Sequence, residues 1–248
     1  MALRRIKADL HVHTCLSPCA DLDMSPREVV KTARGRGIDL LGLCDHNSAE
    51  NIPAVRKAGA HAGVMVLGGM EVTSSEEAHF LAFFDDDDDL REFQEYIYQH
   101  LPGKNDPQVF GLQVITDEED GVEGFCDRLL IGASTLSAEK IITKVHAARH
   151  ASVVIAAHVD RESFSIISQL GFIPPGLALD GVEISSRIGA DQARARFADC
   201  RNFPIISGSD AHRPDEIGMR VTWFTMENGS VAEIKKALAG QDNRSVEL

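Results

Sequence analysis

The chain has 248 residues, of which 44% are hydrophobic and 25% charged, a composition typical of a globular protein. That length suffices for one α/β barrel or for two smaller domains. The formal net charge of −13 argues against a broad surface for gripping nucleic-acid phosphates, although a small anionic substrate is compatible with it if divalent cations lie in the site.

The sequence contains neither a membrane span nor a secretory signal that we can identify. No stretch approaches the roughly 18 uninterrupted apolar residues of a spanning helix. Residues 1–9 carry Arg4, Arg5 and Lys7 but no long apolar segment behind them. The five cysteines are odd in number and follow no disulfide-scaffold spacing. We therefore expect reduced thiols, a cytoplasmic location and no membrane partner.

Apolar runs alternate with helical patterns along most of the chain. Strands are expected at residues 6–11, 38–44, 64–71, 78–84, 152–157, 179–185, 203–207 and 220–225. Helices are expected at 25–34, 47–61, 90–101, 137–150, 163–170, 190–198 and 231–239. Such alternation predicts parallel βαβ units, in sufficient number to close a barrel. The predicted fold class is therefore α/β, with the whole chain, 1–248, as one domain.

The middle of the chain, residues 85–132, interrupts this alternation. A run of five aspartates, Asp85 to Asp89, precedes the helical stretch 90–101, and Pro102, Gly103 and Pro107 follow it. Segments 109–116 and 123–130 flank an acidic turn at 117–121, which predicts a β-hairpin. We interpret this region as a solvated insertion that contains a hairpin; a lid or a dimer contact is the alternative.

Residues that commonly bind metals occur in six short groups near the predicted strand ends. The groups are Asp9-Leu10-His11-Val12-His13, Cys44-Asp45-His46, Gly69-Met70-Glu71-Val72, Ala78-His79-Phe80, Ala157-His158-Val159 and Ser209-Asp210-Ala211-His212. Barrel enzymes place their sites at the C-terminal strand ends, so these groups can meet at one rim. Alone, His79 or His158 is more often a satisfied core histidine; together the groups predict a polynuclear metal site.

The kinds of ligand indicate the chemistry. Imidazoles and carboxylates without repeated thiolates suit Zn²⁺, Mn²⁺ or Fe²⁺. Two ions about 3.5–4 Å apart can hold a hydroxide and clamp the oxygens of a phosphoryl transfer, and Glu71 could bridge them. We find no Gly-x-Ser-x-Gly elbow and no phosphate-binding glycine loop. The sequence therefore indicates a hydrolytic metalloenzyme.

Together these motifs resemble those of the PHP (polymerase and histidinol phosphatase) family. The motifs are His11-Val12-His13-Thr14, Asp45-His46-Asn47, Gly69-Met70-Glu71, Ala157-His158 and Ser209-Asp210-Ala211-His212. The resemblance covers residues 7 to about 240 except the middle region. It implies a distorted seven-stranded (β/α) TIM-like barrel, a trinuclear metal site and phosphoesterase activity.

The resemblance also implies a ligand set. One ion would be held by His11, His13, Glu71 and Asp210, a second by Glu71, His79 and His158, and a third by His46, His212 and Asp21. The third is a departure from the family pattern, because three residues are inserted between Ser17 and Asp21, and Cys19 or Asp23 could substitute. Asp45 is assigned to orienting a ligand imidazole, and Glu183 is a candidate for a similar position.

Further residues are candidates for substrate contacts. The arginines that could bind phosphate through paired donors are Arg161, Arg187, Arg213 and Arg220. His158 or His212 could protonate the leaving oxygen. Four other histidines, His61, His100, His146 and His150, lie in polar helical contexts and are interpreted as non-functional.

The implied function is a metal-dependent phosphatase or phosphodiesterase. Its substrate would be a small phosphorylated metabolite, a nucleotide or a short oligonucleotide, hydrolysed by metal-activated hydroxide. A histidinol-phosphate phosphatase and a non-catalytic metal-binding module are the alternatives within the family. An amidohydrolase-type C–N hydrolase is less favoured, because Glu71 stands where that group places a bridging lysine. Oligomeric state is not predicted.

Overall fold

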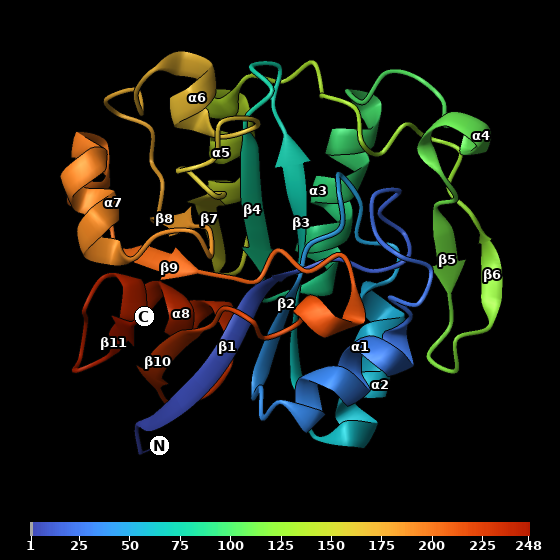
Figure 1. Cartoon of the computed structure of the whole chain (residues 1–248), viewed down its shortest axis with the longest axis horizontal. Coiled ribbons are helices and arrows are strands. Elements are labelled where there is room, and N and C mark those ends of the chain that lie inside the picture. The colour runs from blue at the N-terminus through green and yellow to red at the C-terminus, as the bar shows by residue number, and fades with distance from the viewer. Residues whose placement is uncertain (1) are drawn as a thin grey trace.

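A mixed β-sheet curls into a nearly closed barrel, with helices on its outside (Figure 1). The computed structural model describes residues 2–248. Within these residues the strands lie in the spatial order β11 (Ser245–Glu247), β10 (Thr222–Met226), β1 (Arg4–Val12), β2 (Leu40–Leu43), β3 (Met65–Thr73), β4 (His79–Phe84), β7 (Ser152–Ala156), β8 (Gly181–Ile184) and β9 (Ile205–Ser207). The predicted α/β barrel is confirmed.

The barrel closes next to β1. The first half of β1 pairs with β10, and beyond it the segment that follows β9 takes over. There the backbone N–H of His13 donates to the carbonyl of Ala211 at 3.0 Å, and the N–H of Ala211 donates to His11 at 3.2 Å. Backbone pairing therefore holds the end of β1, which carries His11, beside the segment after β9, which carries Asp210.

The sheet differs from the predicted parallel arrangement in two strands. Strands β1, β2 and β3 are parallel to one another, as are β7, β8 and β9, but β4 is antiparallel to both β3 and β7, and β10 is antiparallel to β1. Five residues, 74–78, separate β3 from β4. A parallel connection needs a dozen residues or more, so this loop can only form a hairpin.

The helices cover the outside of the sheet and one end of the barrel. They are α1 (Pro26–Gly35), α2 (Ile52–Ala62), α3 (Asp87–Gln99), α4 (Pro107–Phe110), α5 (Ala138–His146), α6 (Ile166–Leu170), α7 (Ala190–Arg196) and α8 (Val231–Leu238), with the short 3₁₀ helices η1 (Ala198–Asn202) and η2 (Pro214–Glu216). Val231, Ile234 and Ala237 of α8 join the same buried cluster as Leu81 and Ile155 of the strands. Among residues 2–248, no helix has both the length and the apolar character needed to cross a membrane.

The aspartate run begins a helix of the barrel. Asp86 is the N-cap of α3, and its side chain accepts hydrogen bonds from the backbone N–H groups of Asp88 and Asp89. Acidic side chains at this end also interact favourably with the helix dipole. Leu90 and Phe93 pack into the main core. Residues 87–99 therefore belong to the helical layer of the barrel. An insertion that begins at residue 85 would include this helix, although it packs in the main core.

The predicted hairpin is present and shorter than expected. It consists of β5 (Val114–Thr116) and β6 (Val122–Phe125), which pair antiparallel and lie at the right-hand edge of the molecule in Figure 1. The N–H of Val114 donates to the carbonyl of Cys15, and that of Thr116 donates to Asn51 Oδ1. These bonds attach β5 to the loops at the end of β1 and before α2.

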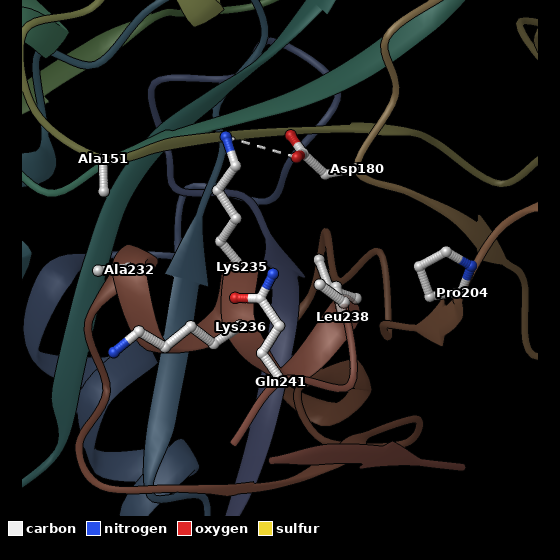
Figure 2. Close-up of a pocket in the computed structure, with 9 residues that line it drawn as sticks. Ala151, Asp180, Pro204, Ala232, Lys235, Lys236, Leu238 and Gln241 are labelled. Atoms are coloured by element: carbon white, nitrogen blue, oxygen red, sulfur yellow. Dashed lines mark ion pairs between the residues drawn. The ribbon is translucent and has the colours of Figure 1, made fainter. Parts of the chain in front are cut away.

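At the N-terminal ends of the parallel strands there is a cavity of about 440 Å³ (Figure 2). Ala151, Asp180 and Pro204 directly precede β7, β8 and β9, and α8 contributes much of the remaining wall. In Figure 2 the side chain of Lys235 points toward Asp180, with 3.6 Å between Nζ and Oδ1. The lining contains neither histidine nor cysteine. In barrel enzymes this end is associated with stability, and the chemistry lies at the opposite end.

Candidate metal centre

Six histidines and two carboxylates from different strands converge at the opposite end of the barrel. They are His11 and His13 at the end of β1, His46 after β2, Glu71 in β3, His79 at the start of β4, His158 after β7, and Asp210 and His212 after β9. Apart from Asp21, which is described below, this is the ligand set that the sequence predicted. The structure brings all eight side chains together; their roles as ligands stay predictions.

An irregularity in β1 aims His11 and His13 inward. The pairing of β1 with β2 shifts register between Asp9 and Val12. Before the shift, Ala8 and Leu10 pack in the cluster that α8 closes; after it, Val12 packs in the cluster that faces the outer helices. A β-bulge changes which side chains face inward, and here it turns two histidines toward the rim.

Glu71 lies at the middle of the cluster. Its Oε1 is 2.9 Å from His79 Nδ1 and 3.1 Å from His158 Nε2, and its Oε2 is 3.2 Å from His46 Nδ1. Each oxygen is also 3.4 Å from one β1 imidazole, Oε1 from His11 and Oε2 from His13. One carboxylate is thus surrounded by five imidazoles, and its two oxygens face different sets of them.

The carboxylate of Asp210 lies between two imidazoles and the guanidinium of Arg161. Its Oδ1 lies 3.2 Å from His11 Nε2 and 3.3 Å from His13 Nε2. Its Oδ2 lies 2.5 Å from Nη2 of Arg161, whose side chain is about one third exposed. Of the four arginines predicted to bind phosphate, Arg161 therefore lies at the cluster.

The donor atoms fit divalent cations. Within residues 2–248, the buried nitrogens His11 Nε2, His13 Nε2, His46 Nδ1 and His158 Nδ1 have no hydrogen-bond partner. Buried polar atoms are seldom left unsatisfied without a reason such as an ion. Two donors about 2.1 Å from one ion lie roughly 3.0–3.4 Å apart, which is the spacing observed around Glu71 and Asp210.

Three sets of side chains have ligand atoms close enough to share an ion. They are His11, His13, Glu71 and Asp210; then His46, Glu71 and His79; and then His13, His46 and His212. Glu71 belongs to two sets, as a bridging carboxylate would. The grouping differs from the predicted one in three ways. His46 rather than His158 joins Glu71 and His79, His13 rather than Asp21 joins His46 and His212, and His158 belongs to none of the three sets.

The cluster perturbs its own ionisation equilibria. Burial lowers the pKa of His46 well below its ordinary value, and burial with the neighbouring His13 lowers the pKa of His212 to about 4. Burial alone would raise the pKa of Glu71 and Asp210, but the surrounding imidazoles outweigh it and hold both values well below the ordinary range. Neutral His46 and His212 beside ionised Glu71 and Asp210 are protonation states that bind metals. His11 differs: burial opposes its protonation, but the carboxylates of Glu183 and Asp210 outweigh burial and raise its pKa well above the ordinary value, so a metal there would displace a proton.

Buried acceptors behind the cluster fix two of the imidazoles. Glu183 accepts from Nδ1 of His11 at 2.8 Å, so Nε2 of that ring faces the cluster. Ser17 Oγ lies 3.0 Å from Nδ1 of His13 and donates to Asp45 Oδ1 at 2.6 Å. Asp45 therefore reaches a ligand imidazole through a hydroxyl rather than directly. Such partners hold ring orientation and tautomer.

Several residues at the rim have left-handed backbone conformations that non-glycine residues rarely adopt. The φ angles are 50° at Asn47, 29° at His158 and 52° at Asp210. A conformation of this kind costs free energy and persists only where its surroundings enforce it. Two of the three residues belong to the cluster, so the backbone is strained where the candidate ligands lie.

The remaining predicted substrate contacts lie farther out. Arg187 and Arg213 are exposed, and Arg213 faces Asp21 and Asp215. Arg220 is partly buried and donates to the carbonyl of Ile188. None of these three lines the 230 Å³ pocket that opens over the cluster, whereas Arg161 does.

Asp21, the residue predicted as the early ligand of the third set, lies outside the cluster of imidazoles. Asp21 is half exposed, and its carboxylate lies 3.7 Å from Arg213 rather than among the imidazoles. Its backbone N–H donates to the carbonyl of His212. Cys19 lines the pocket over the cluster, while Asp23 is exposed. The structure thus does not bring Asp21 into any of the three sets.

A separate set of possible ligand atoms, Asp86, Asp89 and His150, has a structural explanation. Asp89 accepts hydrogen bonds from the ring and backbone of His150 and from Arg149 Nε. These bonds lower the pKa of Asp89 to about 2, although burial opposes them. They tie the start of α3 to the loop before β7, where His150 lies four residues after the end of α5 rather than in a helix.

Two residues of the site escaped sequence analysis. The sequence placed Ser17 only at the start of the inserted residues, and its contacts with His13 and Asp45 were not predicted. Phe164 lines the pocket and stacks on His79 with 4.9 Å between ring centroids. An aromatic residue in the polar segment 160–165 carries no periodic signal, so only the structure could reveal it.

Comparison with known proteins identifies the family. The model described as "PHP domain" matches residues 9–117, and the model described as "PHP-associated" matches residues 191–241. Together the two matches span more than half of the chain and contain seven of the eight clustered side chains, all but His158. The chain belongs to the PHP family, as its motifs predicted.

Individual relatives match over shorter stretches. A 5′-3′ exoribonuclease of Haemophilus influenzae is 34% identical over 71 residues, which are 29% of this chain and 25% of that protein. A phosphoribosyl 1,2-cyclic phosphate 1,2-diphosphodiesterase of Eggerthella lenta is 35% identical over 66 residues, 27% of this chain and 24% of that protein. The matches thus span about a quarter of each of these curated relatives.

Among solved structures, a lesion-specific endonuclease of Pyrococcus furiosus superposes with a TM-score of 0.71. The superposition covers 99% of this chain and 58% of the endonuclease, at 19% sequence identity. At that identity the likeness shows a shared fold. The barrel described above is therefore the PHP-type barrel.

Proposed function

We propose that this chain is a metal-dependent phosphoesterase that hydrolyses a phosphate ester of a small metabolite, a nucleotide or a short oligonucleotide. The observation that carries the proposal is the carboxylate of Glu71 surrounded by five imidazoles, four of which have a buried nitrogen without a hydrogen-bond partner within residues 2–248. The family membership and the names of the two curated relatives support the same reaction class.

Two or three divalent ions, Zn²⁺, Mn²⁺ or Fe²⁺, would be held by the three sets of side chains. The chemistry they supply is a Lewis acid that activates water and neutralises phosphate charge. Glu71 would fix the spacing between neighbouring sites, because its two oxygens face different imidazoles. Glu183 and the pair Asp45–Ser17 would keep the rings of His11 and His13 oriented.

Arg161 is the residue we propose for binding the phosphate. Its Nη2 contacts Asp210, and its Nε is buried without a hydrogen-bond partner within residues 2–248. A guanidinium with an unpaired N–H donor at the edge of the cluster can donate a hydrogen bond to an equatorial phosphate oxygen. The lowered pKa of His212 favours a ligand role for it rather than that of proton donor, because its ring holds no extra proton at neutral pH.

The proposal is tested by elemental analysis of the purified protein, followed by phosphate release from a panel of monoesters and diesters with added Mn²⁺ or Zn²⁺. His13→Ala and Asp210→Asn should each abolish metal-dependent hydrolysis, whereas His61→Ala, at an exposed helical histidine, should retain it. Unchanged activity in both cluster variants would contradict the assignment.

The same panel separates the alternatives. Histidinol phosphate in the panel tests the phosphatase of that name. Bound metal without turnover of any ester would indicate a non-catalytic module. Amide substrates assayed beside this panel test the remaining alternative: hydrolysis of amides but not of phosphate esters would indicate a C–N hydrolase, which Glu71 in the bridging position disfavours.

A further inference from the structure

A large aromatic side chain stands at the mouth of the pocket over the cluster. Phe164 is 46% exposed and lines this pocket together with Cys19, Ile131 and Arg161. One side of its ring stacks on the imidazole of His79, with planes inclined by 17°. The exposed fraction of the ring therefore offers a flat apolar surface next to the candidate metal ligands.

The backbone holds Phe164 in this place against its own preference. Its φ angle is 58°, a left-handed conformation that is unusual for a bulky residue. The carbonyl of Phe164 accepts the N–H of His79 at 2.9 Å. Next to it, the buried hydroxyl of Ser165 donates to the carbonyl of Arg161 at 2.9 Å. A strained residue fixed from both sides at a site mouth indicates a function that needs the side chain there.

Arg161 and Phe164 come from the same short loop. The N–H of Arg161 donates to the carbonyl of His158, so the loop begins at a cluster residue and folds back over it. The guanidinium of Arg161 reaches Asp210, while the ring of Phe164 lies on His79. One loop thus fixes the distance between the guanidinium of Arg161, which can bind a phosphate, and the ring of Phe164, on which a planar ring can stack.

We propose that Phe164 is a stacking platform for the nucleobase of a nucleotide unit whose phosphate lies at the cluster. This inference rests on the proposed function and narrows its substrate class. Bases stack on aromatic side chains through their π-faces with little sequence preference. Phe164 stacks on His79, whose Nδ1 lies 2.9 Å from Glu71. A base on the exposed face of Phe164 would therefore lie farther from Glu71 than His79 does, as a ribose separates base from phosphate.

The test is a binding titration of Mn²⁺-loaded protein. One probe is a phosphonate analogue of adenosine 5′-monophosphate, in which a CH₂ group replaces the ester oxygen and prevents hydrolysis. The other is methylphosphonate, which has the anionic group but no base. Phe164→Ala should weaken binding of the nucleoside phosphonate about tenfold and leave that of methylphosphonate unchanged. Phe164→Trp should bind the nucleoside phosphonate at least as tightly as the natural protein.

Phe172→Ala is the matched control, because Phe172 is 50% exposed and does not line the pocket. It should bind both probes as the natural protein does. Equal affinity of Phe164→Ala and the natural protein for the nucleoside phosphonate, or an equal loss for both probes, would overturn the platform. So would a natural protein that binds the two probes equally well.

The failure of this inference differs from the failure of the proposed function. If the protein hydrolyses phosphate esters but Phe164→Ala binds the nucleoside phosphonate normally, the reaction stands and the base platform does not. If no ester is hydrolysed, the reaction fails, and the titration still reports whether the base contributes to binding.

Discussion

The carboxylate of Glu183 accepts a hydrogen bond from Nδ1 of His11 at 2.8 Å, and its second contact is the backbone N–H of His158 at 3.1 Å. One buried acid therefore orients the side chain of His11 and the backbone of His158, another candidate ligand. Its own oxygens do not enter the three sets of ligand atoms. Glu183 is a positioning residue for both.

Glu183→Gln should weaken metal binding by about 10- to 100-fold, the usual effect of losing a charged partner of a ligand histidine. The measurement is a competition titration of the purified, metal-free protein with a chromophoric chelator. Glu50→Gln serves as control, since Glu50 accepts from Tyr98 away from the cluster. Equal metal affinity in the natural protein and Glu183→Gln would refute this role.

Gly208 is required by close packing behind the cluster. A Cβ atom at this position would lie 2.7 Å from both Glu183 Oε1 and His11 Cβ. Gly208→Ala should therefore displace the pair and lower the free energy of unfolding by about 1–3 kcal/mol, with loss of bound metal. Urea unfolding and elemental analysis measure the two effects. Gly35→Ala, where the added Cβ meets open space at the end of α1, should not destabilise the protein.

Metal addition should stabilise the fold through Glu71. At a free metal concentration 100 times the Kd, binding adds about 2.7 kcal/mol, which corresponds to a rise in Tm of roughly 5–10 °C for a chain of this size. Glu71→Gln should lose most of that rise, and His61→Ala should keep it. Differential scanning calorimetry with Mn²⁺ and with a chelator makes the comparison; a full rise in Glu71→Gln would argue against a bridging role.

The ion pair of Glu233 with Arg244 predicts a pH dependence of stability. Glu233 receives two hydrogen bonds from Arg244, at 2.9 and 3.0 Å, which lower its pKa from 4.5 to about 2 although burial opposes them. A lowered folded-state pKa contributes stability above pH 4.5, and this contribution is lost as the pH falls from 4.5 toward 2.

Glu233→Gln should accordingly lower the free energy of unfolding at pH 7 by about 1–3 kcal/mol. The difference from the natural protein should shrink as the pH is lowered through that range. Urea unfolding at pH 7, 5 and 3.5 follows it, and Glu92→Gln, at an exposed pair with Lys144, is the control. A difference that stays constant with pH would contradict the assigned pair.

Most strands could be predicted because buried strands read as apolar runs. The strands expected at 152–157 and 179–185, for example, contain β7 and β8. The direction of β4 was missed, although the five residues before it already exclude a crossover. Strand β11 was missed because its three residues, Ser245 to Glu247, are partly exposed and mixed in polarity.

The candidate centre was predictable to the extent that its side chains follow strands. His158 and Asp210 follow the ends of β7 and β9 by two and three residues, so barrel geometry alone places them at one rim. His79 reaches the rim for a different reason, since it begins an antiparallel strand. The hydroxyl of Ser17 and the ring of Phe164 depend on loop conformations, which a sequence pattern does not specify. Asp21 was predicted by alignment with a family motif, but its carboxylate lies beside Arg213 rather than among the imidazoles.

The reversed strand β4 also affects how the centre can assemble. Glu71 and His79 are eight residues apart and meet across a single hairpin, so their contact needs little loop-closure entropy. The ligands from the two ends of the chain meet only when the barrel closes. An ion bound first by Glu71 and His79 would thus stabilise the later docking of the segments that carry His11 and Asp210. Cation binding would then be coupled to closure of the barrel, the last step of folding.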